Sequence, residues 1–143
     1  MIRHMKQEDL DIIAKMEAET FANPWSAEEI LADLEGNPFY HYYVMEDNGK
    51  IIGYAALQAI FEQADLARII IDPSCRKSRL GGQLLDYVIE QARKLECERV
   101  LLEVRPSNTP ARALYASRGF AWIRTSEKYY SNGEDALILA LGI

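Results

Sequence analysis

A carboxylate, an amide and a phenol lie close together in the segment from residue 99 to residue 120. Glu103 lies within an apolar, strand-like run, Asn108 follows at a turn, and Tyr115 lies two helical turns further on. A carboxylate can act as a general base and a phenol as a general acid. Each residue also has a structural interpretation: a solvent-facing glutamate, a helix-capping asparagine and a core tyrosine packed against Phe120. The segment therefore combines groups for proton transfer with groups that build a strand, a turn and a helix.

A second segment, from residue 72 to residue 85, has the composition of an anion-binding site. It follows the nearly continuous aliphatic run 66–71 and opens a helix. The N–H groups and the dipole of a helix N-terminus attract anions, and Arg76, Lys77 and Arg79 add positive charge. Basic turns between a strand and a helix are also common on protein surfaces, so the loop alone leaves both interpretations open.

The sequence around these segments predicts a mixture of strands and helices, which places the chain in the α/β (α+β) fold class. Apolar residues at helical spacing predict helices over 7–21, between the capping residue Ser26 and Gly36, over 80–95 and over 109–117. Aromatic, β-branched or alternating runs predict strands over 2–5, 39–46, 51–61, 66–71, 100–105, 120–129 and 135–141. There is no linker, repeat or low-complexity stretch, so we expect a single domain over residues 1–143.

Composition excludes several classes of function. The chain has 143 residues, 49% of them hydrophobic, but no apolar run approaches the roughly 20 residues that span a bilayer. The N-terminus lacks the apolar block of a signal peptide, so we expect a cytoplasmic protein without a membrane partner. Two cysteines and two histidines match no metal-ligand spacing, so we expect no metal.

The balance of charge bears on the partners. With 16 basic and 22 acidic residues the net charge is −6, which makes the chain a poor binder of phosphate backbones. We therefore expect no nucleic-acid partner. The acidity suits a cationic substrate, although a solvated acidic surface would explain it equally well.

The pattern L-E-V-R-x-S-N-x-x-A-x-x-L-Y-x-x-x-G-F at residues 102–120 resembles the second half of acetyltransferases of the GNAT family. These enzymes move an acetyl group from acetyl-coenzyme A (acetyl-CoA) to an amine. The resemblance implies the GNAT fold, with a mixed, mostly antiparallel sheet of six to seven strands flanked by about four helices. It also implies that Glu103 is the base, acting through a water, that Tyr115 protonates the thioester sulfur, and that Asn108 contacts the pantetheine arm.

The resemblance assigns the basic loop to the phosphates of coenzyme A. The family's loop reads Q/R-x-x-G-x-G/A, and here Arg76 and Gly81 are in register, whereas Arg79 stands at the first glycine position. Glycine there permits an unusual φ and a close backbone approach. Either Arg79 tolerates that geometry and adds a phosphate contact, or the affinity for the cofactor is weakened. The implied cofactor contacts are the strand backbone and the loop: Ile69, Ile70, Ile71, Arg76, Lys77, Ser78, Arg79, Leu80, Gly81 and Gly82.

Two further motifs resemble the RimI family, bacterial acetyltransferases that modify the N-terminal alanine of a small-subunit ribosomal protein. They are F-A-N-P-W-S at residues 21–26 and Y-Y-S-N-G-E-D-A at residues 129–136. The resemblance implies an Nα-acetyltransferase of a ribosomal protein, which we expect to be monomeric and to transfer the acetyl group directly, without a cysteine nucleophile. Trp25 and the pair Tyr129 and Tyr130 would form two walls of a groove for the peptide terminus. Core packing is the alternative for these aromatic residues.

Two other functions remain open on the sequence. The chain could acetylate a lysine side chain or a small amine. The departure at Arg79 also leaves open a non-catalytic module that binds acyl-CoA without turnover.

Overall fold

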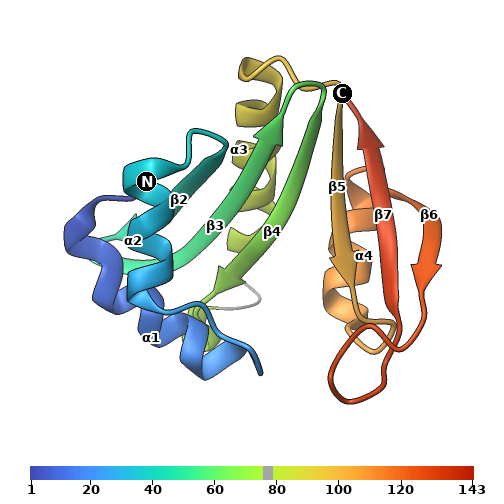
Figure 1. Ribbon diagram of the computed structural model, residues 1–143, viewed down its shortest axis with the longest axis horizontal. Coiled ribbons are helices and arrows are strands. Elements are labelled where there is room, and N and C mark those ends of the chain that lie inside the picture. The colour runs from blue at the N-terminus through green and yellow to red at the C-terminus, as the bar shows by residue number, and fades with distance from the viewer. Residues whose placement is uncertain (76–78) are drawn as a thin grey trace.

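The computed structural model describes residues 1–75 and 79–143. Within these residues a seven-stranded sheet has the strand order β1-β2-β3-β4-β5-β7-β6, and four α-helices flank it (Figure 1). The pair β4–β5 is parallel and the other pairs are antiparallel, which confirms the predicted mixed, mostly antiparallel sheet. The elements are β1 (Ile2–His4), η1 (Gln7–Asp9), α1 (Leu10–Thr20), α2 (Ala27–Gly36), β2 (Tyr40–Asp47), β3 (Lys50–Ile60), β4 (Gln63–Ile71), η2 (Pro73–Cys75), α3 (Leu80–Lys94), β5 (Arg99–Val104), α4 (Thr109–Ser117), β6 (Ala121–Ser126) and β7 (Ala136–Gly142).

Helices cover both faces of the sheet. One apolar cluster joins the sheet to α3 and α4, and a second cluster joins it to α1 and α2. Strand alternation separates the two: Tyr43 of β2 points into the first cluster, whereas Tyr42 and Val44 point into the second. The stripe predicted for residues 80–95 is buried in the first cluster through Leu84, Leu85, Val88, Ile89 and Ala92. The sheet therefore separates an α1/α2 side from an α3/α4 side.

The strands β4 and β5 pair for only part of their length. Their parallel ladder runs from Gln63 and Arg99 to Leu66 and Leu102 and then ends, and the strands diverge (Figure 1). A β-bulge at Ala67 of β4 lies at this point, where the pairing with β3 shifts register. A bulge bends its strand and increases the local twist. Beyond Leu66 the edge of β4 that faces β5 is consequently left without a neighbouring strand in the described part of the chain.

Two strand boundaries differ from the prediction by three residues, and the others agree within one residue. β4 begins at Gln63, not at residue 66, because the small residue Ala64 is buried between Ala59 of β3 and Val100 of β5. β6 ends at Ser126, whereas the aromatic run suggested a strand to residue 129. Lys128 turns the chain out of the strand with a φ of 50°, and its backbone N–H donates to a side-chain oxygen of Asp135. Tyr129 and Tyr130 thus lie in a loop.

Candidate active site

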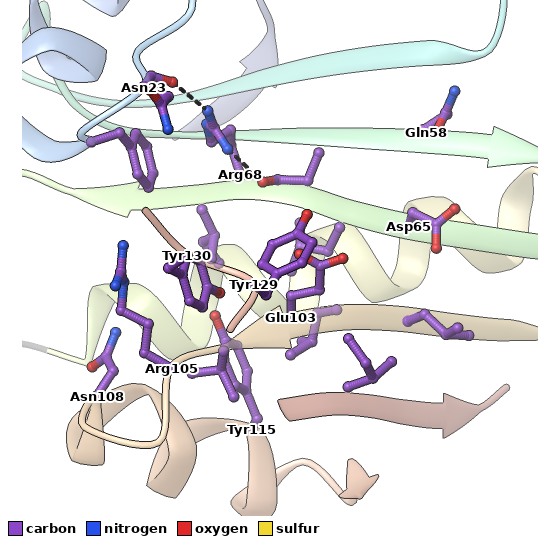
Figure 2. A pocket seen from close by; sticks show the side chains of 18 of the residues that line it. Asn23, Gln58, Asp65, Arg68, Glu103, Arg105, Asn108, Tyr115, Tyr129 and Tyr130 are labelled. Atoms are coloured by element: carbon purple, nitrogen blue, oxygen red, sulfur yellow. Dashed lines mark hydrogen bonds between the residues drawn. The ribbon is translucent and has the colours of Figure 1, made fainter. Parts of the chain in front are cut away.

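A cleft of about 1020 Å³ lies where β4 and β5 diverge. It is lined by both strands, by the segment between α1 and α2, by the start of α4 and by the loop between β6 and β7. Figure 2 shows Asn23 and Arg68 on one side of the cleft, Asn108 and Tyr115 on the other, and Glu103 between them. The cleft therefore connects the α1/α2 side of the sheet with the α3/α4 side.

Glu103 is exposed to the cleft. On β5 the residues Val100, Leu102 and Val104 are buried toward α3, so strand alternation turns Glu103 to the other face. Tyr129 lies beside Glu103, and the interaction of its phenol with the Glu103 carboxylate raises the pKa of Tyr129. A carboxylate that is open to water is suited to accept a proton.

Tyr115 lies on the inner side of α4 and lines the same cleft. Its side chain is buried, and its ring packs edge-on against Phe120 with 5.9 Å between the ring centroids. Burial, with a smaller contribution from Tyr130, raises the pKa of Tyr115 to about 12. The phenol consequently keeps its proton at neutral pH and can donate it. The packing interpretation is confirmed, and it is compatible with a role in the cleft.

Asn108 begins α4. Its side-chain oxygen accepts a hydrogen bond from the backbone N–H of Ala111 at 3.3 Å, so the predicted helix cap is present. Asn108 also lines the cleft. The cap fixes the start of the helix that carries Tyr115, which places the amide and the phenol on the same wall.

The predicted cofactor loop is described only in part. Arg76, Lys77 and Ser78 lie outside the described residues. Arg79 precedes α3 and has a φ of 65°, the left-handed conformation that the family's glycine would adopt readily. Arg79 therefore adopts a conformation that favours glycine, and Leu80 and Gly81 follow in the first turn of a 15-residue helix. An N-terminus of this kind suits phosphate groups.

Gly82 has a packing role that the sequence did not indicate. The glycine is buried, and a Cβ atom at this position would collide with the guanidinium of Arg118. That guanidinium donates to both carboxylate oxygens of Asp86, at 3.0 and 3.2 Å. The absence of a side chain at Gly82 thus lets the segment after α4 pack against α3.

The three isoleucines at the end of β4 divide between the two sides of the sheet. Ile70 is buried among the side chains of α1 and α2, whereas Ile69 and Ile71 pack toward α3. Ile69 also lines the cleft. The backbone of this part of β4 runs along the diverging edge, where an extended ligand can pair as an additional strand.

The predicted aromatic walls are both part of the cleft lining. Trp25 packs edge-on against Tyr40, with 6.1 Å between the ring centroids. Tyr129 and Tyr130 pack edge-on against each other at 5.1 Å, and the guanidinium of Arg105 lies 3.8 Å from the centre of the Tyr130 ring. These residues pack against neighbours and also face the cleft, and their contact with a peptide terminus stays a prediction.

The sequence analysis missed several polar residues that line the cleft. They include Asp65 and Arg68 of β4, Arg105 after β5 and Arg124 of β6. Arg68 had a recognisable signal, because it is a single charged residue within the aliphatic run 66–71. No comparable signal marked Asp65 or Arg124.

Two absences concern the described residues, 1–75 and 79–143. Among these, no group of three His, Cys, Asp or Glu side chains is placed to hold a metal ion. In the same part of the chain, no helix has the length and apolar character required to cross a membrane.

The profile of the acetyltransferase (GNAT) family matches residues 10–120. The chain belongs to the GNAT family. An Escherichia coli K12 relative named [ribosomal protein bS18]-alanine N-acetyltransferase is 34% identical over 145 residues, covering 99% of this chain and 97% of the relative. A Bacillus subtilis protein, provisionally named as an enzyme of the same kind, is 36% identical over 139 residues, 96% of this chain and 92% of its own.

Solved structures agree with the sequence relatives. The crystal structure of the Escherichia coli ribosomal-protein-S18-alanine N-acetyltransferase superposes with a TM-score of 0.89 at 33% identity, covering all of this chain and 93% of that one. The Ard1 structure from Thermoplasma volcanium has the same fold, with a TM-score of 0.86 at 21% identity, covering 100% of this chain and 97% of that chain. The predicted membership of the RimI branch of the GNAT acetyltransferases is confirmed, and the protein is an acyltransferase. Enzymes of this family use acetyl-CoA.

Proposed function

We propose that this enzyme transfers the acetyl group of acetyl-CoA to the N-terminal amine of a ribosomal protein whose first residue is alanine. The near full-length similarity to the Escherichia coli enzyme of that name supports this substrate. The observation that carries the proposal is the opening between β4 and β5. It brings Glu103 from one face of the sheet and Tyr115 from the other into a single cleft.

The residues on the α3/α4 side fit acetyl-CoA. The diverging edge of β4 at Ile69 to Ile71 offers backbone groups to the pantetheine arm, and Asn108 offers its amide from the opposite wall. The N-terminal turn of α3, from Arg79 to Gly82, offers N–H groups and the positive end of a helix dipole to the phosphates. We include Arg76, Lys77 and Ser78 in this site on the sequence alone. Acetyl-CoA supplies a thioester whose acetyl carbon the amine attacks.

The side chains divide the proton transfers between them. Glu103 accepts a proton from the substrate ammonium through a water molecule, which frees the nitrogen lone pair to form the new C–N bond. An α-amino group has an ordinary pKa of about 8, so a carboxylate working through water is an adequate base. Tyr115 donates its phenolic proton to the sulfur as the C–S bond breaks, and the second proton that the nitrogen loses on becoming an amide restores the phenol through water. The transfer is direct and needs no acyl-enzyme.

The acceptor enters from the α1/α2 side of the sheet. Trp25 on one wall and Tyr129 and Tyr130 on the other hold the extended N-terminus, and their rings offer contact area at little cost in side-chain entropy. We further propose that residues 1–143 form one GNAT domain. In this proposal the enzyme works as a monomer in the cytoplasm, where ribosomes are found, without a nucleic-acid, membrane or metal partner.

One pair of peptides tests the proposed acceptor. The first begins with alanine and carries an internal lysine, and the second is identical except that its α-amine is blocked. We expect acetylation of the first peptide at its terminus, located by mass spectrometry, and none of the second. Acetylation of the lysine in the blocked peptide would support a side-chain acetyltransferase instead. Binding of acetyl-CoA in a thermal-shift assay without turnover of either peptide would support a binding module.

A further inference from the structure

A buried carboxylate lies behind the acceptor wall, the side of the cleft that Phe21 and Trp25 form. Glu17 of α1 is completely buried, and it accepts hydrogen bonds from the Tyr54 hydroxyl, from the backbone N–H of Trp25 at 2.8 Å and from Nε of Arg68 at 3.0 Å. Removing a carboxylate from water is costly, and a buried ion pair is often no more stable than apolar side chains of the same volume. A role other than stability should therefore be sought for the pair of Glu17 and Arg68.

Arg68 connects this carboxylate to the segment between α1 and α2. Its guanidinium lies between the rings of Phe21 and Trp25, 4.1 Å from the centre of each, and one terminal nitrogen donates to the carbonyl oxygen of Asn23 at 3.3 Å. Glu17 in turn holds the backbone of Trp25. The ion pair thus fixes both ends of a segment, residues 21–25, that has no helix or strand of its own.

The β-bulge explains why Arg68 faces this segment. Ala64 and Leu66 point toward α3, and regular alternation would turn residue 68 to the same side. The extra residue at Ala67 reverses the alternation, so Arg68 points toward α1 and α2. The arginine consequently reaches the acceptor wall at the height where β4 and β5 diverge (Figure 2).

The charge of Arg68 extends across the cleft. Tyr129 lies on the opposite wall of the cleft. Glu103 raises the pKa of Tyr129, and the positive charge of Arg68 lowers it. Arg68, Phe21 and Trp25 all line the cleft, whereas the N-terminal turn of α3 lies at the end of a helix on the opposite face of the sheet. A change at Arg68 should therefore affect the site of the acceptor much more than the site of the cofactor.

We propose that Arg68, fixed by buried Glu17, is a positioning residue that determines how the enzyme accepts its amine substrate. It holds the wall formed by Phe21 and Trp25 at the distance from Tyr129 that admits one extended chain. This inference rests on the proposed peptide acceptor for its kinetic consequences, but its consequence for the position of Trp25 does not depend on which amine is used.

The first experiment compares Arg68→Lys with Arg93→Gln. Lysine keeps the positive charge beside Glu17. It lacks the planar guanidinium, which stacks on two aromatic rings and donates hydrogen bonds to several oxygen atoms. We expect the KM for the alanine peptide to rise about tenfold in Arg68→Lys, with KM for acetyl-CoA and kcat each within about twofold of the wild type. Arg93 pairs with Glu90 at 3.2 Å on the exposed face of α3, and neither residue lines the cleft, so Arg93→Gln should change none of these values.

The second experiment observes the wall directly. The chain has two tryptophans, so Trp122→Phe leaves Trp25 as the single reporter. In that background we expect acrylamide to quench Trp25 fluorescence more strongly in Arg68→Lys than in the parent or in Arg93→Gln. This measurement needs no turnover, so it decides the inference even if the wild-type enzyme fails to acetylate the alanine peptide and the proposed function is wrong.

A neutral pair separates positioning from stability. In Glu17→Gln combined with Arg68→Met no unpaired charge is left in the core, so folding should be largely kept. A positioning role predicts that the acceptor KM stays raised and Trp25 stays more accessible in this double variant. Wild-type quenching in both Arg68→Lys and the double variant would overturn the inference. An equal rise in the KM for acetyl-CoA would overturn it too, because it would indicate general disruption of the site.

Discussion

At the scale of single residues, Tyr115 has a packing role beside its proposed role as general acid. Its ring fills the core beside Phe120, and its pKa of about 12 keeps the hydroxyl protonated at neutral pH. Replacing Tyr115 with phenylalanine keeps the ring and removes only the proton donor. We expect turnover to fall on the order of a hundredfold or more, the usual contribution of a general acid, with little change in the melting temperature or in acetyl-CoA affinity. Single-turnover kinetics on the folded variant would check this, and unchanged turnover would leave Tyr115 as a packing residue only.

Glu103→Gln tests the base. The glutamine keeps the shape of the side chain and an acceptor for the Tyr129 hydroxyl, so stability should be nearly unchanged. We expect the loss in kcat/KM to be greatest at low pH, because there the substrate amine is mostly protonated and needs a base most. A pH–rate profile that is lowered in parallel at every pH would instead assign Glu103 to positioning the peptide.

The same variant has a spectroscopic consequence that is independent of turnover. The interaction with the Glu103 carboxylate raises the pKa of Tyr129. Removing that charge should therefore lower the pKa of Tyr129, and ultraviolet titration of the tyrosines would detect ionisation at a lower pH than in the wild type.

At the scale of elements, the start of α3 depends on a backbone conformation that arginine adopts at a cost. A non-glycine residue in the left-handed region is less stable by roughly 1–2 kcal/mol, and Arg79 has a φ of 65°. Arg79→Gly and Arg79→Ala remove the same guanidinium but differ in this strain. We expect the glycine variant to be more stable than the alanine variant by about 1 kcal/mol in urea unfolding.

The two Arg79 variants also separate backbone from charge in cofactor binding. Both should bind acetyl-CoA more weakly than the wild type and with less dependence on salt, because both lose one positive charge beside the phosphates. Calorimetry at two ionic strengths would measure this. Equal stability of the two variants would contradict the left-handed conformation, and unchanged affinity would exclude a contact between Arg79 and the phosphates.

Local sequence signals predicted the elements that carry the reacting groups. The alternation in β5 placed Glu103 opposite the buried valines, and the turn chemistry at Asn108 predicted the start of α4. These signals were sufficient because each concerns neighbours in the sequence. The fold as a whole followed from the family resemblance, since the order β5-β7-β6 is a matter of tertiary pairing that no local pattern records.

The bulge at Ala67 shows where sequence reasoning failed. Its effect is to turn Arg68 toward α1 and α2, yet a bulge is defined by pairing with β3 and leaves no mark in the run 66–71 itself. Glu17 was missed for a similar reason, because a glutamate on an amphipathic helix ordinarily faces solvent. Its burial depends on partners that are distant in the sequence, Tyr54 and Arg68.

At the scale of the whole molecule, the protein carries a net negative charge, and we propose that its cleft receives an amine. The net charge is −6, and Asp65 and Glu103 contribute carboxylates to the cleft lining. Within the described residues the cleft arginines Arg68 and Arg105 are paired with Glu17 and Glu134, whereas the cleft arginine Arg124 forms no ion pair there. The long-range field of the protein should therefore attract cationic acceptors, whereas the anionic cofactor depends on the local site at the start of α3.

This field can be tested with acceptor peptides that share an N-terminal alanine and differ in charge beyond the cleft. We expect a peptide with distal lysines to have a several-fold higher kcat/KM at low ionic strength than the same peptide with distal glutamates, because charge steers the encounter. The difference should shrink as salt shortens the screening length from about 30 Å at 0.01 M to about 3 Å at 1 M. A difference that persists at high salt would require a direct contact in the cleft, for which Asp65 is the first residue to replace. Equal rates at low salt would show that the acidic surface has no part in substrate capture.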